Sequence, residues 1–423
     1  MNLELHKIAI RKLEWGPRTG ARDHVLTVNK EELVSLLLED PALRNVEAEL
    51  VHPGESVRIL PCKDAVEPRC KLEGPGEVFP GWIGDVDTVG QGKTLVLEGA
   101  AVLTTGRLVA PQEGIVDMSG PGAAYTPFSK TCNVVLVFEP VDGVELHELE
   151  AVYRRAGLKA AYYLASCCKE DKADTVESYA FPPLAEAMNA WPGLPKVAYL
   201  YMLQSQGLLH DTWVYGVDVK KILPTMISPT EIMDGAIISG NCVSACDKNS
   251  TYTHVNNPVI KSLYAHHGKD INFVGVIITN ENVTLADKKR SSSYAVKLTR
   301  MLGVDGLVIS EEGFGNPDAD LIMNCWKAER AGIKTVLITD EYAGRDGSSQ
   351  SLADSCPEGD ACVTAGNANE VIVLPPMQPA TADVIAGGFF GSLREDGSME
   401  VELQAIMGAT SELGFNRIGG RTL

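Results

Sequence analysis

The sequence has few basic residues and no long apolar runs, and both absences exclude classes of protein. Its 37 Lys and Arg residues are outnumbered by 56 Asp and Glu residues, giving a formal net charge of −19 over 423 residues. Binding to nucleic acid or to an anionic membrane needs basic patches, so neither partner is expected. No run approaches the roughly 18 apolar residues of a membrane helix, and no secretory signal pattern opens the sequence. We therefore expect a cytoplasmic protein.

Paired cysteines and clustered histidines are also missing. The ten cysteines are scattered and none belongs to a CxxC pair, so reduced thiols are expected in a cytosolic chain. His254, His266 and His267 have no matching ligand cluster nearby in the sequence. A zinc site needs four convergent donors, or three with a water. The sequence therefore predicts no metal.

A dinucleotide-binding loop is incomplete. Gly313 and Gly315 follow an apolar run and precede a helical pattern. The third glycine of that fingerprint is replaced by Asp318. No NAD or flavin is therefore predicted.

Residues 1–143 are predicted to form a β-rich domain, barrel-like or sandwich-like. Short apolar runs such as Leu3–Ile10 and Val46–Val51 are separated by Gly and Pro, which is typical of such folds. Asn29 has the pattern of an N-cap that opens a helix ending near Leu38. Residues 144–224 are predicted to be a mainly helical connecting region, beginning with a helix over Val144–Leu164.

Residues 225–423 are predicted to form a doubly wound α/β domain with a parallel sheet, which makes the whole chain α/β. The pattern is one of short apolar strands with helical segments between the first three of them. The expected strands are Phe273–Thr279, Gly306–Ile309, Thr335–Ile338 and Val371–Leu374, and the expected helices lie around Lys288–Leu302 and Pro317–Ala331.

Acidic residues follow three of these strands. Glu281, Glu311, Glu312 and Glu341 stand at the carboxyl ends of their strands, where ligands bind in such sheets. Glu311, Glu312 and Glu341 are therefore candidates for a substrate pocket that binds an amine, or for a surface that binds a partner protein. Alternatively, these acids are helix caps and first-turn residues that the helix dipole favours.

The dipeptide Asn241-Cys242 offers a chemistry of its own. A thiolate is the reactive form of cysteine, and that of Cys242 can attack the Asn241 carbonyl to convert the peptide bond into a thioester. Loss of the Cα proton and of the thiocarboxylate would leave an N-terminal dehydroalanine, which becomes an imine and then a pyruvoyl group. Two simpler interpretations stay open. One is a buried thiol in a turn, and the other is a Cys242/Cys246 pair for redox or metal chemistry.

Several stretches in fixed order resemble one family. They are residues 240–251, Val255–Pro258, Gly74–Gly76, Phe79–Gly81, Asp117–Gly122, Tyr125–Asn133, Glu311–Asn316 and Thr339–Glu341. The sequence is similar, over almost its full length, to the alpha/beta proproteins of component B of the glycine, sarcosine and betaine reductases. D-proline reductase is a more distant relative.

The resemblance implies self-cleavage between Asn241 and Cys242, with Cys242 becoming a pyruvoyl group that forms a Schiff base with the substrate amine. It implies a role in the reductive deamination of glycine to acetyl phosphate and ammonia. The expected partners are a selenocysteine-containing subunit of component B, a small selenoprotein carrier, an acetyl-phosphate-forming component and the amino-acid substrate.

Other functions remain open at this point. Sarcosine or betaine could be the substrate, although betaine is a quaternary amine and cannot form a Schiff base. A pyruvoyl-dependent decarboxylase would use the same electrophile without a selenoprotein. An α/β scaffold in which Asn241-Cys242 is never cut would need no chemistry at all.

Overall fold

The computed structural model describes residues 1–106, 108, 114–207, 209–239, 249–312, 314–379, 392–415 and 419–422. The predicted cleavage site, Asn241 and Cys242, lies outside the described residues. No helix within these ranges is both long enough and apolar enough to cross a bilayer. All eight cysteines in them are free thiols.

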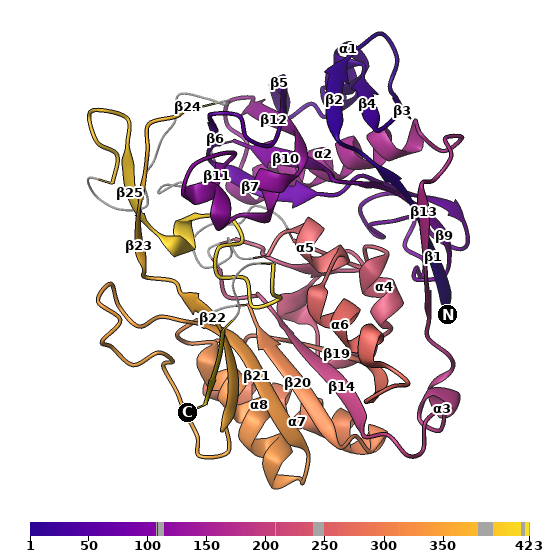
Figure 1. The fold of residues 1–423 in the computed structure, drawn as a ribbon, viewed down its shortest axis with the longest axis vertical. Helices are drawn as coiled ribbons and strands as arrows, with labels where there is room; N and C mark the ends of the chain where they lie inside the picture. Colours follow the sequence, from indigo (N-terminus) through magenta and orange to yellow (C-terminus); the bar gives the residue numbers. More distant parts are fainter. Residues whose placement is uncertain are drawn as a thin grey trace.

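Two four-stranded sheets dominate the N-terminal part (Figure 1). The strand orders are β13-β1-β9-β8 and β5-β12-β10-β7, and each sheet contains one parallel pair, β1 with β9 and β10 with β12. The bounds are β1 (Asn2–Ala9), β5 (Leu43–Val51), β7 (Cys62–Val66), β8 (Arg69–Glu73), β9 (Gly92–Glu98), β10 (Ala100–Thr105), β12 (Cys132–Pro140) and β13 (Thr175–Ala180).

Two helices belong to this part. Helix α1 (Lys30–Leu37) begins after Asn29, whose side chain accepts a hydrogen bond from the Glu32 amide at 3.2 Å, so the predicted N-cap is confirmed. Helix α2 (Leu146–Ser166) packs against β7, β8 and β10. The approach is close because Gly157 has no side chain; a Cβ there would meet the Thr104 methyl group at 2.5 Å.

A seven-stranded sheet forms the second large unit, in the order β17-β19-β14-β20-β21-β22-β26. Its five central strands are parallel, and the edge strands β17 and β26 are antiparallel. The bounds are β14 (Lys196–Leu203), β17 (Thr225–Ile227), β19 (Asn272–Asn280), β20 (Gly306–Glu311), β21 (Lys334–Glu341), β22 (Ala361–Asn367) and β26 (Gly419–Thr422).

Helices cover both faces of this sheet. One core contains residues of α7 (Leu285–Leu302) and α8 (Asp318–Arg330) with Ala198, Leu200 and Ile277. The other contains residues of α4 (Pro229–Met233) and α6 (Pro258–His266) with Tyr199 and Tyr201. Alternate residues of β14 thus face opposite layers, as in any strand buried on both sides. The α/β fold class is confirmed.

Two sequence expectations are corrected. The region 144–224 is helical in α2, in the short α3 (Leu184–Ala187) and in one turn of 3-10 helix, Val219–Lys221. It also supplies β13, which pairs with β1, and β14, which lies at the centre of the large sheet. Strand β23 (Val371–Leu374) exists but pairs with β25 (Met399–Glu402) outside that sheet, and its Val373 is half exposed. The division at residues 143 and 224 stays a prediction.

Short elements complete the described chain. They are β2 (Lys12–Trp15), β3 (Gly20–Arg22), β4 (Val25–Val28), β6 (Val57–Ile59), β11 (Val116–Asp117), β15 (Trp213–Val214), β16 (Val217–Asp218), β18 (Ile237–Ile238), β24 (Gln378–Pro379) and α5 (Thr251–Val255). Strand β18 and helix α5 flank the predicted cleavage segment, residues 240–248, so they locate the candidate site.

Candidate active site

The two ends of segment 240–248 are held together. The Ser239 amide donates a hydrogen bond to Thr251 Oγ1 at 3.1 Å, so the two described flanks of residues 240–248 lie side by side. Thr251 in turn contacts Asp64 of β7 twice. Its amide donates to Oδ1 at 2.9 Å and its hydroxyl to Oδ2 at 2.7 Å. A buried carboxylate of the N-terminal part therefore fixes the point where the segment returns to described structure.

Asp64 has an environment unusual for an acid. It is buried, and burial raises the pKa of its carboxyl to about 6, although its hydrogen bonds with Thr251 and the Ala65 amide act in the opposite direction. A carboxyl with such a pKa can exchange a proton near neutral pH. Asp64 is therefore both an anchor of the segment and a candidate proton carrier.

The return end of the segment is also fixed from the C-terminal part of the chain. Asn249 donates from Nδ2 to Glu412 Oε1 at 2.7 Å and accepts from the Ser411 hydroxyl at 2.8 Å. All three side chains are buried. Residues from two distant stretches, Asp64 and the pair Ser411 and Glu412, thus converge on the flanks of segment 240–248.

A tyrosine, a histidine and a glutamate meet beside α5. Tyr201 of β14 bonds His254 Nδ1 at 2.7 Å and Glu312 Oε1 at 3.1 Å, and His254 Nε2 lies 3.6 Å from the same glutamate oxygen. The other Glu312 oxygen accepts from the Gln204 amide at 2.6 Å. This arrangement places groups capable of acid–base chemistry at the carboxyl ends of β14 and β20.

His254 is uncharged at neutral pH. It is completely buried, and burial lowers the pKa of its imidazole to about 3. Burial also raises the pKa of Tyr201 well above its usual value. The pair therefore offers a neutral hydrogen-bonding unit rather than an ion pair with Glu312.

Glu281 lies at the end of β19 on the same edge of the sheet. The pKa of this carboxyl is raised to about 8, mainly by burial and also by the nearby acids Glu312, Asp211 and Asp320. One of its oxygens accepts from the Ser205 amide at 3.0 Å, which favours the charged form but does not offset the burial. Glu281 is therefore protonated at neutral pH.

The three predicted pocket residues reach this edge but do not share one environment. Glu312 contacts Tyr201, whereas Glu311 accepts from the Thr339 hydroxyl at 3.2 Å. Glu341 accepts from Ser351 and lines a cavity of about 350 Å³ beside β21 and β22. The sequence correctly predicted that the strand ends converge, and the role of these glutamates in binding an amine stays a prediction.

The polar loop Asp117–Lys130 packs on the same site. Its Phe128 ring lies edge-on against Tyr252 of α5, with centroids 5.5 Å apart, and Tyr252 also contacts Phe415. Asp117 is buried and bonds the Arg58 guanidinium through both oxygens, at 2.7 and 2.9 Å. The loop is therefore fixed, and it supports the helix that follows segment 240–248.

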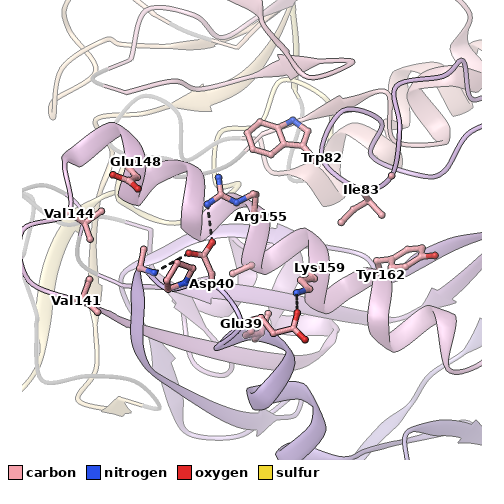
Figure 2. A pocket seen from close by; sticks show the side chains of 15 residues that line it. Glu39, Asp40, Trp82, Ile83, Val141, Val144, Glu148, Arg155, Lys159 and Tyr162 are labelled. Carbon is pink, nitrogen blue, oxygen red and sulfur yellow. Dashed lines mark hydrogen bonds and ion pairs between the residues drawn. The ribbon is translucent and has the colours of Figure 1, made fainter.

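A larger cavity lies elsewhere, between α1, α2 and the loop that carries Trp82 (Figure 2). Its volume is about 840 Å³, and apolar side chains such as Trp82 and Ile83 line it. Four of its five charged residues pair at its rim, Lys159 with Glu39 at 2.6 Å and Arg155 with Asp40 at 2.9 Å. None of the predicted site residues lines it.

Comparison with known proteins decides the family. The model of the glycine/sarcosine/betaine reductase component B subunits matches residues 1–421. The chain belongs to this family. It is similar to "Glycine reductase complex component B subunits alpha and beta" of Acetoanaerobium sticklandii (61% identity) and of Peptoclostridium acidaminophilum (58%). It is also similar to "Sarcosine reductase complex component B subunit alpha" of Peptoclostridium acidaminophilum (52%). Each alignment covers 100% of both chains. No solved structure matches.

Membership in this family shows a subunit of a reductase complex, which confirms the resemblance inferred from the sequence. Sequence reasoning did not find Asp64, Tyr201 or the state of His254. The one available signal for Asp64 was a charged residue inside a strand that is otherwise flanked by apolar runs. Tyr201 carries no signal, because aromatic residues are ordinary in buried strands.

Proposed function

We propose that this chain is the precursor of the substrate-binding subunits of component B of a glycine reductase, activated by cleavage before Cys242. The supporting observation is that both glycine reductase relatives, aligned over their whole length, carry two subunit names, alpha and beta, on one chain. Two subunits from one chain require a cut. Asn241-Cys242 is the dipeptide whose chemistry can make it without a protease.

The proposed cleavage needs no oxidant. The Cys242 thiol adds to the Asn241 carbonyl. The C–N bond breaks as the C–S bond forms, which leaves a thioester between Asn241 and Cys242 and a free amine on Cys242. A base removes the Cα proton, and the C–S bond of Cys242 breaks to release a thiocarboxylate on Asn241. The resulting enamine becomes an imine, and water replaces its nitrogen with oxygen to release ammonia. The products are fragments 1–241 and 242–423, the second beginning with a pyruvoyl group.

The pyruvoyl carbonyl would supply an electrophile for the glycine amine, which no ordinary side chain provides. This chain's own residues would do the rest of the positioning. The hydrogen bond between Ser239 and Thr251 joins the two flanks of residues 240–248, and the hydrogen bonds with Asp64 fix the position of Thr251. After cleavage the new ends would stay near one another, since these contacts lie outside the bond that is cut.

Glycine is the preferred substrate because identity is higher to the two glycine reductase relatives, 61% and 58%, than to the sarcosine relative at 52%. The reduction itself would need partners. We propose a selenocysteine-containing subunit of component B, a small selenoprotein carrier and an acetyl-phosphate-forming component, because the described cysteines are predominantly buried thiols.

The test is intact mass spectrometry of protein purified with its native partners, before and after borohydride treatment with glycine. Two fragments are expected, and the fragment starting at residue 242 should gain the mass of a reduced glycine adduct. Sarcosine in place of glycine should give less adduct. Fragments without an adduct would contradict the electrophile, and carbon dioxide release from glycine without a reductant would favour a decarboxylase.

A further inference from the structure

Two histidines and a glutamate meet where the start of α2 touches the connection after β14. His147 and Glu150 are one helical turn apart on α2, and His210 reaches them from the loop before β15. One ligand atom from each residue lies within 4.8 Å of the others. The His147 and His210 rings are 4.8 Å apart between centroids. Imidazole and carboxylate are the donor types that zinc binds.

The spacing of one pair already fits a metal. His147 Nδ1 lies 3.3 Å from Glu150 Oε2. Two ligand atoms of a tetrahedral zinc, each about 2.1 Å from the ion, are about 3.4 Å apart. The His147 side chain is 66% exposed, so a change of its rotamer can close the wider separations without moving the backbone.

The surroundings hold the other two ligands in place. His210 donates from Nδ1 to Asp218, which is buried, and this leaves Nε2 as the nitrogen for a metal. A carboxylate behind a metal-binding histidine is the usual arrangement, because it fixes the ring and makes it a better donor. The other oxygen of Glu150 accepts from the Arg154 guanidinium and from the His210 amide, at 2.7 and 3.0 Å.

We propose that His147, Glu150 and His210 bind one divalent transition metal ion of the zinc class, with water in the fourth position. The His210 side chain is 32% exposed, so an ion can enter from solvent. The ion would join α2 to the loop that contains Asp211. The Asp211 carbonyl lies 3.5 Å from the Ser239 hydroxyl, at the base of the cleavage segment. The site would thus stabilise the connection between the N-terminal part and the flank of residues 240–248.

The test uses the full-length chain treated with a chelator, desalted and titrated with Co²⁺ and with Zn²⁺. Metal content by plasma mass spectrometry should reach one ion per chain. The Co²⁺ form should show visible ligand-field bands of a four-coordinate site without the near-ultraviolet charge-transfer bands of thiolate ligands. Thiolate bands would assign the ion to the chain's cysteines and overturn the proposal.

The exposed ligand gives the cleanest variant. His147→Ala should fold normally and bind Zn²⁺ at least tenfold more weakly. The matched control is His266→Ala. His266 Nδ1 also forms a hydrogen bond with a nearby carboxylate, Asp270 Oδ2 at 2.6 Å, but His266 is not part of the three-residue cluster. Equal affinity in wild type and His147→Ala would overturn the proposal.

Asp218 is proposed as a positioning residue, not a ligand. Asp218→Asn should keep one ion per chain but weaken Zn²⁺ about tenfold and alter the Co²⁺ ligand-field spectrum, since the His210 ring would lose its charged partner. An unchanged affinity and spectrum would contradict the orientation assigned to His210.

Discussion

Acidic residues occur in two contrasting settings in this protein. At the rim of the large cavity beside α2, Glu39 and Asp40 are partly exposed, and each is paired with a cation. At the carboxyl edge of the seven-stranded sheet, Glu281 and Glu312 are buried, and the charges near Glu281 that shift its pKa are other acids. The charges at the rim of this cavity therefore perturb one another little, whereas the acids at the sheet edge help to raise the pKa of Glu281 to about 8.

The difference between exposed, paired acids and buried acids indicates where acid–base chemistry is to be expected. An exposed ion pair contributes little and perturbs little. A buried acid without a cation must be protonated or must be stabilised by hydrogen bonds, and both outcomes change its reactivity. Such groups concentrate at functional sites. By this criterion the buried sheet edge near the flanks of segment 240–248 is a better candidate site than the cavity beside α2.

The largest expected effect comes from Glu281→Gln. The pKa of Glu281 is about 8 in the folded chain and about 4.3 when unfolded. Between these values only the unfolded state ionises, so wild-type stability falls as pH rises, by about 1.4 kcal/mol per pH unit. The Gln variant does not ionise at this position, so its free energy of unfolding does not show this decrease with rising pH. Urea unfolding should show the variant gaining about 4 kcal/mol relative to wild type between pH 4 and pH 8. A difference that does not change with pH would show that Glu281 is charged in the folded chain.

Asp64→Ala should come next. It removes two hydrogen bonds to Thr251 and leaves the Thr251 amide without its acceptor, which should cost about 3 kcal/mol at neutral pH. Cleavage should slow, because the base of the segment loses its anchor. The matched control is Asp40→Ala, which loses a partly exposed pair with Arg155 and a hydrogen bond from the Ala42 amide and should cost about 1 kcal/mol. Equal decreases in the free energy of unfolding of Asp64→Ala and Asp40→Ala would contradict the distinction between buried acids and acids at the cavity rim.

His254 should show an acid-side effect. Its pKa is about 3 in the folded chain and about 6.5 when unfolded. Below pH 6.5 the His254 imidazole is protonated in the unfolded state but stays neutral in the folded state, so the free energy of unfolding decreases as pH falls. Lowering the pH from 7 to 5 should cost wild type about 2 kcal/mol more than His254→Asn. Equal pH dependence in chemical denaturation would mean that His254 is protonated when folded.

The smallest effect is expected at the cavity rim. Glu39→Gln breaks an ion pair with Lys159 whose two side chains are substantially exposed, so the free energy of unfolding should change by less than about 0.5 kcal/mol. Cleavage should proceed at the wild-type rate. A variant that cleaves several-fold more slowly would move the functional site toward the cavity.

Much of the fold followed from local pattern. Strands β19, β20 and β21 contain continuous apolar runs, and β19 is buried along its whole length, whereas Lys334 and Val336 of β21 are exposed. Helices α7 and α8 carry the helical period between these strands. Asn29 supplied its own helix start. The pairing of strands that are far apart in the sequence could not be predicted from local pattern. Nothing local in Lys196–Leu203 says that it inserts between β19 and β20, because that choice depends on the whole sheet.

The site divides in the same way. The acids after the strands were predictable, since parallel strands bring their carboxyl ends to one edge. Asp64 and Tyr201 were not, because their role depends on contacts with Thr251 and His254 from distant stretches. The cluster of His147, Glu150 and His210 was missed for the same reason, since its third member arrives from another element.

The most direct measurement is the intact mass of Cys242→Ala beside that of wild type, both purified with native partners. The account predicts two fragments, 1–241 and 242–423, for wild type and a single uncut chain for the variant. Cleavage of Cys242→Ala at the same bond would mean that Asn241 cyclises or that a protease acts, and it would contradict a pyruvoyl group derived from Cys242.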